Sequence, residues 1–296
     1  MNEADASLVV VAFHRPDALR TLLAGVSGGG LDVIVVNVEA DAAVAAVAEA
    51  SGARLVATDA NVGFAAAVNR GSALAIGDVV MFCNDDLTLD ASTVSQLAAP
   101  IRRGEADVVV PAIVDRDGQV ERTIAPLPTV GALFREWFLL PDIPPTAMER
   151  WRHVQKWRLP SQPERVDAAT AAAVAVRADL LRRRPLPEAY FLYWEESEWF
   201  WWLHRDRARV LYLPAASVRH DGGRGDVRPD KARLLARNAV RCVRRTQGRA
   251  HAAVAYVVVV LWNMRLFVLS VARRRFVAVR WAGLMAALTS VREVWS

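Results

Sequence analysis

The chain has 296 residues, of which 53% are hydrophobic and 23% charged, a composition that excludes a disordered protein and allows a sizeable core. Its two cysteines, Cys83 and Cys242, lie far apart in the sequence, which argues against a disulfide framework and favours a reducing compartment. The acidic first residues lack the basic and apolar regions of a signal peptide.

The net charge of +5 is unevenly distributed along the chain. Residues 205–296 contain 19 of the 37 basic residues and 5 of the 32 acidic ones, which gives this part +14 and leaves −9 on residues 1–204. A basic C-terminal third indicates an anionic partner, such as phosphate, lipid head groups or nucleic acid.

Apolar runs and helical patterns alternate over the first 114 residues. Strands are expected at residues 7–13, 31–36, 54–57, 79–83 and 107–114, and helices at 16–26, 42–50, 62–76 and 91–102. This alternation predicts an α/β fold in which helices cover both faces of a parallel sheet. No glycine-rich dinucleotide or phosphate loop follows the first strand, because Phe13-His14-Arg15-Pro16 stands there.

The pattern changes after residue 114. Residues 115–165 are rich in proline and tryptophan, which predicts an irregular excursion of the kind that forms the wall of a binding site. A strand at 166–176, a helix at 178–184, a segment at 190–203 that becomes helical near Glu195 and a strand at 208–213 are expected next. We therefore expect one domain over residues 1–229 and a helical C-terminal extension over residues 230–296.

The C-terminal extension combines a basic and an apolar helical segment. Ala252–Ala272 is long enough to span a bilayer, but Arg265 near its middle would cost roughly 2.5–3.5 kcal/mol there. We expect this helix to lie in the membrane interface, with arginines reaching anionic head groups; packing against the body of the protein or on a second protomer is the alternative. The valine run fits lipid better than bases, so no nucleic-acid partner is expected. Arginines at helical spacing form one cationic face before it: Arg233, Arg237, Arg241, Arg244 and Arg245.

The expected strand at 79–83 is followed by two carboxylates, in the order Asn84-Asp85-Asp86. Ligands of open α/β sheets bind just past the carboxyl ends of the strands. Mg²⁺ takes one or two carboxylates and completes its shell with water and phosphate oxygens. The pair therefore predicts a cation site, with an acidic turn as the alternative, because Asn and Asp are common turn formers.

Four segments occur in a distinctive order. They are the Asp59–Gly71 block with its Asn-Val-Gly-Phe core, the Asn84–Asp86 strand end, Glu195-Glu196 after an aromatic run, and residues 218–223 with His220. Together they resemble the family 2 glycosyltransferases of the GT-A fold, particularly the bacterial rhamnosyltransferase-like members that build cell-wall and surface polysaccharides. The resemblance covers about residues 7–225. It implies a GT-A-type, mostly parallel sheet, a nucleotide-diphosphosugar donor, Mg²⁺ or Mn²⁺, and inversion at the anomeric carbon.

The resemblance also implies roles for the acidic residues. Asp86 is the expected metal ligand, Asp85 a second ligand or a contact to the donor, and His220 lies near the diphosphate and metal. A hydrogen-bonded loop histidine is the alternative for His220. Glu196, with Glu195 as its partner, is the expected general base. The family has Glu-Asp at this pair, so which of the two takes the proton stays open, and an acidic helix start is the alternative.

The remaining expected contacts concern the donor and the acceptor. Asn37-Val38-Glu39 stands where the family commonly has Asp-Asn-Gly or Asp-Asn-Ser, which leaves the choice between UDP- and dTDP-sugars open. Helix capping is the alternative for Asn61. The expected donor contacts are Asn37, Glu39, Asn61, Gly63, Asn69, Asp85 and Arg224, and the expected acceptor contacts are Thr170 and Trp194.

The leading hypothesis is an inverting, metal-dependent glycosyltransferase. It would move a rhamnose-like or other hexose from a dTDP- or UDP-sugar to a polyprenyl-linked or growing glycan acceptor, on the cytoplasmic face of the cell membrane. The C-terminal helices offer a surface for a homo-oligomer. A catalytically degenerate protein that binds glycan or scaffolds a membrane complex is the alternative. A nucleotidyltransferase is disfavoured, because the first strand lacks a glycine-rich basic loop after it.

Overall fold

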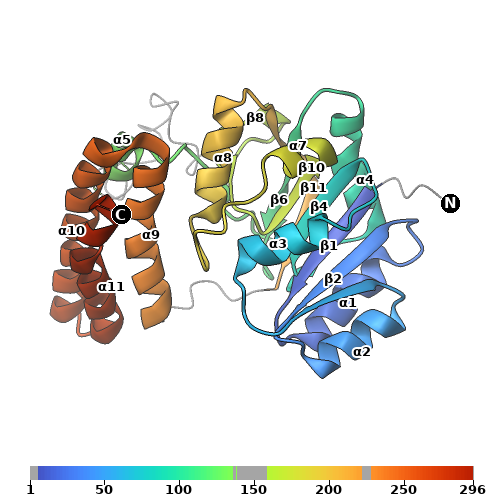
Figure 1. The fold of residues 1–296 in the computed structure, drawn as a ribbon, viewed down its shortest axis with the longest axis horizontal. Coiled ribbons are helices and arrows are strands. Elements are labelled where there is room, and N and C mark those ends of the chain that lie inside the picture. The colour runs from blue at the N-terminus through green and yellow to red at the C-terminus, as the bar shows by residue number, and fades with distance from the viewer. Residues whose placement is uncertain (1–5, 136–137, 139–158, 222–227, 296) are drawn as a thin grey trace.

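The computed structural model describes residues 6–135, 138, 159–221 and 228–295. Figure 1 shows a sheet flanked by helices and, beside it, a group of C-terminal helices that faces α8. The strands are β1 (Ala6–Ala12), β2 (Asp32–Val38), β3 (Arg54–Thr58), β4 (Val79–Asn84), β5 (Leu87–Thr88), β6 (Val108–Val114), β7 (Ile124–Ala125), β8 (Glu164–Arg165), β9 (Ala168–Ala169), β10 (Ala173–Arg177) and β11 (Val210–His220).

Helices occur where the sequence predicts them up to residue 114, at 178–184 and from Glu195, whereas the short helix Val130–Phe134 lies in the segment that was expected to be irregular. They are α1 (Pro16–Val26), α2 (Ala42–Ala50), α3 (Phe64–Ser72), α4 (Ala91–Arg102), α5 (Val130–Phe134), α7 (Ala178–Arg183), α8 (Glu195–Arg205), α9 (Pro229–Gln247), α10 (Arg249–Ala272), α11 (Val277–Thr289) and α12 (Val291–Trp295). The helix expected at 62–76 is shorter, because it starts after Gly63, whose φ of 82° lies in the left-handed region, and ends at Ser72.

The main sheet has the order β3-β2-β1-β4-β10-β6-β11-β5, and β8 adds to β11. Strands β1 to β4 run parallel, and β6 is parallel to β11. Strand β10 lies antiparallel between β4 and β6. The expectation of one strand over 166–176 is wrong, because the segment contains two separate strands. That segment forms β9, which pairs with β7, and then β10. The predicted α/β class with a mostly parallel sheet is confirmed.

Two apolar layers cover the sheet because buried residues alternate along its strands. On β1, Leu8 and Val10 join the core with helices α1, α2 and α4, whereas Val9 joins the core with α3, α7 and α8. The first layer uses Leu22 of α1 and the second Trp199 of α8, both fully buried. Helices on both faces leave the carboxyl ends of the strands as the open edge of the sheet.

Strand β11 runs further than its apolar run predicts. Its register against β6 shifts between Leu213 and Ser217, around Pro214, and the strand then continues to His220. The continuation pairs His220 with Leu87 of β5, the residue after Asp86. A β-bulge of this kind re-aims side chains near functional sites, and here it brings a late residue to the end of β4.

The C-terminal helices α9 to α12 form their own apolar core. Ala239, Val259 and Ala287 are fully buried in it, and Trp194, just before α8, packs against it. Leu133 of α5 joins a neighbouring cluster with Val243 of α9 and again Trp194. The extension is therefore packed on the sheet domain through the segment that carries Glu195 and Glu196.

Candidate functional site

Asp85 lies buried directly after β4, with 5% of its surface exposed. Its Oδ2 accepts a hydrogen bond of 2.8 Å from the backbone N–H of Phe13, at the end of the neighbouring strand β1. Burial raises the pKa of Asp85 to about 6, although this hydrogen bond and the nearby Arg15 act in the opposite direction. Asp85 therefore joins two parallel strand ends, as expected at the carboxyl edge of such a sheet.

Asp86 is surrounded by cationic and titratable groups. Arg15 donates a hydrogen bond from Nη1 to Asp86 Oδ2, and His220 Nε2 lies 3.4 Å from Asp86 Oδ1. Glu121 Oε2 lies 3.6 Å from the other ring nitrogen of His220. Burial alone would raise the pKa of Asp86, but His220 and Arg15 outweigh it and lower that pKa. The Asp86 carboxylate in turn raises the pKa of His220. The structure therefore brings Asp85, Asp86 and His220 together.

The donor atoms present fit one side of a divalent-metal site. Asp86 Oδ1 and His220 Nδ1 are buried and have no hydrogen-bond partner among the described residues. Within residues 6–135, 138, 159–221 and 228–295, no group of three or more His, Cys, Asp or Glu has the geometry of a complete metal cage. A carboxylate that leaves most coordination positions to water and substrate phosphate is the usual arrangement for Mg²⁺ at phosphate sites, whereas the imidazole is a ligand better suited to transition metals.

The second acidic pair, Glu195 and Glu196, begins helix α8. Two consecutive residues with left-handed backbone precede it, Tyr193 (φ 68°) and Trp194 (φ 80°), although neither is glycine. Such backbone persists only where the surroundings hold it. Asn238 of α9, 2% exposed, donates 3.0 Å hydrogen bonds from Nδ2 to the carbonyl oxygens of Leu192 and Tyr193. A residue of the C-terminal extension thus positions the turn that aims the acidic pair.

The two glutamates differ in environment. Glu195 is 4% exposed, and burial, followed by the neighbouring Glu196 carboxylate, raises the pKa of Glu195 to about 8. Burial and the adjacent Glu196 carboxylate therefore favour the protonated form of Glu195. Glu196 lines a cavity of about 330 Å³ between the sheet domain and the C-terminal helices. This difference favours Glu196 as the proton acceptor.

The buried Glu195 also predicts a pH-dependent stability. In the unfolded chain Glu195 ionises near its ordinary pKa of 4.5, so between pH 4.5 and about 8 the unfolded state binds fewer protons than the folded state. Stability from Glu195 is thus present below pH 4.5 and is lost as pH rises towards 8. We expect the free energy of unfolding of Glu195→Gln to equal that of the wild type at pH 4.5. Above that pH it should exceed the wild-type value by an amount that grows by up to about 1.4 kcal/mol per pH unit. Urea denaturation across this pH range measures the difference, and parallel curves for the two proteins would contradict it.

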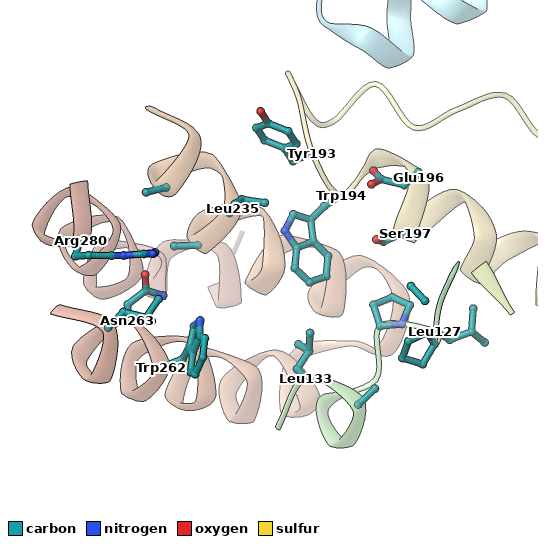
Figure 2. Close-up of a pocket in the computed structure, with 17 residues that line it drawn as sticks. Leu127, Leu133, Tyr193, Trp194, Glu196, Ser197, Leu235, Trp262, Asn263 and Arg280 are labelled. Carbon is teal, nitrogen blue, oxygen red and sulfur yellow. The ribbon is translucent and has the colours of Figure 1, made fainter. Parts of the chain in front are cut away.

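Trp194 projects into the middle of the cavity, with Glu196 near one end and Arg280 of α11 near the other (Figure 2). Apolar walls and a few polar groups are typical of a small-molecule site. The apolar wall includes Leu127, Leu133, Leu235, Trp262 and Leu266. Trp194 thus lies where an acceptor contact is expected, and the far wall comes from helices that the sequence places outside the family resemblance.

In the sequence, Thr170 lies between the two acidic pairs, Asp85-Asp86 and Glu195-Glu196. It follows β9, which packs against α8, and its backbone N–H donates 2.9 Å to Thr123. Two residues later, the carbonyl oxygen of Ala172 accepts a 3.1 Å hydrogen bond from Asn84, next to Asp85. Thr170 is not among the residues that line the cavity of Glu196 and Trp194, so its acceptor role stays a prediction. Arg224 lies outside the described residues.

The residues after β2 are organised differently from the expectation. Asn37 is 1% exposed, and its amide bonds to the backbone of Asp41. It donates a hydrogen bond of 2.8 Å to the Asp41 carbonyl oxygen and accepts one of 3.0 Å from the Asp41 N–H. It holds the turn before α2 and does not present its amide to a nucleotide. Glu39 has a left-handed φ of 67° and pairs with His14 Nε2 at 2.9 Å. Glu39 is exposed at the strand edge, as a donor contact requires.

The amides of the Asp59–Gly71 block also have structural partners. Asn69 Nδ2 donates hydrogen bonds of 2.9 Å to the carbonyl oxygen of Leu186 and 2.8 Å to Glu188 Oε1, and Asn69 Oδ1 accepts one of 3.0 Å from the Leu186 N–H. Asn69 therefore links α3 to the 186–188 segment, in place of the contact to the sugar donor that was expected. Asn61 accepts 3.1 Å from the Gly63 N–H instead of capping α3, whose N-cap is Gly63 itself.

Gly63 makes its close approach to the chain rather than to a ligand. A Cβ on Gly63 would lie 2.3 Å from the carbonyl oxygen of Phe191, at a φ of 82°. We expect Gly63→Ala to lower the free energy of unfolding by about 3 kcal/mol, from left-handed strain plus the clash. Gly118→Ala, at φ 74° with nothing within 4 Å of the added Cβ, is the control and should cost about 1 kcal/mol. Chemical denaturation distinguishes them, and equal losses would contradict the clash.

Three residues of this region have functions that the sequence did not indicate. Arg15 supplies a cation to Asp86, and Asn238 holds the turn before α8. His14 pairs with Asp41 at 2.7 Å as well as with Glu39, and these two carboxylates raise the pKa of His14. The available signal was the Phe13–Pro16 segment, which occupies the place of a phosphate loop after the first strand. Nothing in the sequence around Asn238 indicates its partners.

The model of the family described as glycosyl transferase family 2 matches residues 7–155. Among solved structures, the chain is similar to glucosyl-3-phosphoglycerate synthase from Mycobacterium tuberculosis in complex with Mn²⁺, UDP and glucosyl-3-phosphoglycerate. The two share 19% identity over 83% of this chain and 80% of that one, with a TM-score of 0.55. No match was found among curated proteins.

Two further solved structures share the fold. S. aureus TarS (residues 1–349) is 15% identical over 97% of this chain and 81% of that one, with a TM-score of 0.54. GalNAc-T7 with UDP, GalNAc and Mn²⁺ is 16% identical over 82% of this chain and 48% of that one, with a TM-score of 0.57. The family match covers half of the chain, and the sheet agrees with the expected GT-A architecture. The chain therefore belongs to glycosyl transferase family 2.

Proposed function

We propose that this glycosyltransferase transfers a sugar from a nucleoside-diphosphate sugar to an acceptor hydroxyl, in a single displacement that inverts the anomeric carbon. The observation that carries the proposal is the separation of two chemistries. Asp85, Asp86, Arg15 and His220 gather at the end of β4, whereas Glu196 lines an apolar cavity bounded by helices α9, α10 and α11. The first cluster suits an anionic leaving group and the second suits an alcohol. The M. tuberculosis synthase and GalNAc-T7, which share the fold, bind UDP and Mn²⁺, which supports a nucleotide-sugar donor.

Asp86 and His220 are the proposed residues for Mg²⁺ or Mn²⁺. A bound divalent cation supplies positive charge to the departing diphosphate. Arg15, which already contacts Asp86, adds a second positive charge beside the same group. Asp85 is held by the Phe13 N–H and faces the junction of β1 and β4, where it can accept hydrogen bonds from the ribose or the sugar. Glu39 and His14 lie at the next strand end and offer polar contacts to the nucleoside.

Glu196 is the proposed general base. It accepts the proton of the acceptor hydroxyl as that oxygen attacks the anomeric carbon, and the nucleoside diphosphate departs on the opposite side. A positioned base of this kind contributes about 10²–10⁴-fold to the rate. Glu195, kept protonated by burial, adds no second negative charge beside the reacting oxygen at neutral pH. Trp194 and Thr170 are the proposed acceptor contacts.

The proposed acceptor is polyprenyl-linked or a growing glycan, handled at the cytoplasmic face of the membrane. Among the described helices, α10 alone is long and apolar enough to cross a membrane by length and composition, and its apolar window is 22% buried. One face of α10 packs on α9 and α11 and the other is exposed. The apolar residues of the exposed face recur every three or four positions, and they are Val254, Val257, Leu261, Met264, Val268 and Val271.

The charge around this face suits an anionic lipid surface. Residues 249–292 contain no Asp or Glu, and Arg273, Arg274 and Arg275 follow α10 directly. An apolar helix face flanked by arginines lies in the interface plane of anionic membranes. The same face would also serve a homo-oligomer, and flotation with anionic vesicles against size-exclusion chromatography distinguishes the two. A rhamnose-like or other hexose remains the proposed sugar, with UDP or dTDP as the nucleotide.

A binding screen tests the proposal without knowledge of the acceptor. The melting temperature is measured with UDP-, dTDP- and GDP-sugars, each with and without Mn²⁺. We expect one nucleotide class to raise the melting temperature, and to do so more strongly with Mn²⁺. Asp86→Asn should remove the Mn²⁺ dependence. If no nucleotide sugar shifts the melting temperature under either condition, the proposed donor site is wrong.

A further inference from the structure

A second cavity, of about 800 Å³, lies between α8, α9 and α12, and its wall is dominated by arginine. It is lined by Ala189, Glu198, Trp202, Arg237, Arg241, Arg244, Arg245, Arg292 and Glu293. Glu198 follows Glu196 by two residues on α8, so the two side chains point to different sides of the helix. This arginine pocket is therefore separate from the cavity that holds the proposed base.

The lining is strongly positive. Among the described residues of the lining, five arginines face two glutamates, which is a formal excess of three positive charges. Four of the arginines come from consecutive turns of α9, at positions 237, 241, 244 and 245, and Arg292 comes from α12. Like charges are not gathered at such density for stability, because mutual repulsion disfavours it unless an anion is bound.

The two glutamates hold Arg237 and Arg245 by one edge only, whereas Arg241 is also bound through both Nη atoms, to Glu293 Oε1 at 3.2 Å and to the carbonyl oxygen of Ala189. Glu293, 6% exposed, accepts 2.6 Å from Arg237 Nε and 2.8 Å from Arg241 Nε. Glu198, 2% exposed, accepts 2.7 Å from Arg245 Nε. Because the carboxylates are buried, they hold these guanidinium groups in set orientations.

The outer edges of the Arg237 and Arg245 guanidinium groups remain available. Among the described residues, Arg237 and Arg245 make no hydrogen bond through their Nη atoms, and Arg292 makes no ion pair. The side chains of Arg237 and Arg245 are 56% and 46% exposed, so a ligand can reach them. A guanidinium held at Nε presents its two Nη groups, which match two oxygens of a phosphate group.

We propose that the arginine pocket binds a phosphate-bearing anion, distinct from the sugar donor. A cavity of this size accepts more than one phosphate group, so a diphosphate or a phosphorylated head group fits it. The ligand is either a soluble phosphate compound or the head group of an anionic lipid, and the shared chemistry is a phosphate clamped between α9 and α12. The pocket is built by the helical extension, so the site goes beyond the proposed transfer reaction.

The test compares three variants of the full-length protein. Arg237→Gln and Arg292→Gln each remove one positive charge from the pocket. Arg233→Gln is the matched control, because Arg233 lies on the same helix, is similarly exposed, and pairs with Asp230 at 2.7 Å outside the pocket. Isothermal titration with sodium pyrophosphate measures the soluble ligand. Flotation with phosphatidylglycerol-containing vesicles, against phosphatidylcholine alone, measures the lipid head group.

We expect Arg237→Gln and Arg292→Gln to weaken one of these interactions about tenfold, whereas Arg233→Gln leaves it near the wild-type value. Loss of pyrophosphate affinity assigns a soluble ligand, and loss of vesicle binding alone assigns a lipid head group. Pyrophosphate that binds at the donor site is unaffected by any of the three variants, so it cannot mimic this pattern. If all three variants bind both probes equally, the arginines only tie α9 and α12 to α8, and the proposal is wrong. Arg292→Gln keeps the test valid if Arg237→Gln misfolds.

Discussion

Replacement of Asp86 by asparagine is expected to lower the turnover of nucleotide sugar about a thousandfold. The substitution keeps the size of the side chain but removes the charge that faces Arg15 and His220. Charge stabilisation of a departing diphosphate is worth several kcal/mol, and about 4 kcal/mol corresponds to a thousandfold in rate. The measurement is the release of nucleoside diphosphate from the donor that the binding screen identifies, with Mn²⁺ varied.

Asp17→Asn is the matched control for this substitution. Asp17 lies on α1, has a side chain 92% exposed, and pairs only with Arg20 on the same helix among the described residues. We expect the turnover of Asp17→Asn to equal that of the wild type. Asp86→Asn with turnover within a few-fold of the wild type, and the same dependence on Mn²⁺, would mean that the acidic pair is a turn and not a cation site.

Replacement of Glu196 by glutamine is expected to lower turnover by about 10²–10⁴-fold and to leave donor affinity unchanged. The amide keeps the shape of the side chain but cannot accept the proton of the acceptor hydroxyl. Measured separately, turnover and donor binding should therefore respond differently. Equal loss of both would place Glu196 in the donor site instead.

Two comparisons sharpen this result. Glu195→Gln should have a smaller effect at neutral pH, because burial already keeps Glu195 protonated. Glu49→Gln, on the exposed end of α2, should change nothing. If all three variants matched the wild type in every measurement, the protein would be a degenerate member of the family that acts by binding or scaffolding.

The sequence predicted the part of the fold that depends on local pattern. Apolar runs separated by helical periodicity located β1 to β4 and β6 with the helices between them, because a parallel sheet covered on both faces requires such runs. The antiparallel insertion of β10 between β4 and β6 was not predictable, since a short apolar strand carries no information about its direction or its neighbours.

The candidate site divides in the same way. Asp85 and Asp86 follow a buried strand directly, so the sequence alone located them at the sheet edge. The contact of His220 with Asp86 depends on a bulge that lengthens β11. Asn238 contacts the turn before α8 from a helix far along the chain, so neither contact was predictable from local sequence. Asn37 and Asn69 looked like ligand-binding amides, but an amide can serve a backbone turn equally well, and only the contacts decide between these uses.

The most direct test of the proposed reaction is the Mn²⁺-dependent turnover of a panel of nucleotide sugars by the full-length protein, with a membrane-lipid extract as the source of acceptor. We expect one donor to be consumed, with its sugar recovered in the lipid or glycan fraction, and we expect chelation of the metal to stop the reaction reversibly. Absence of transfer from every donor, in a protein that is folded and supplied with Mn²⁺, would contradict the proposed function.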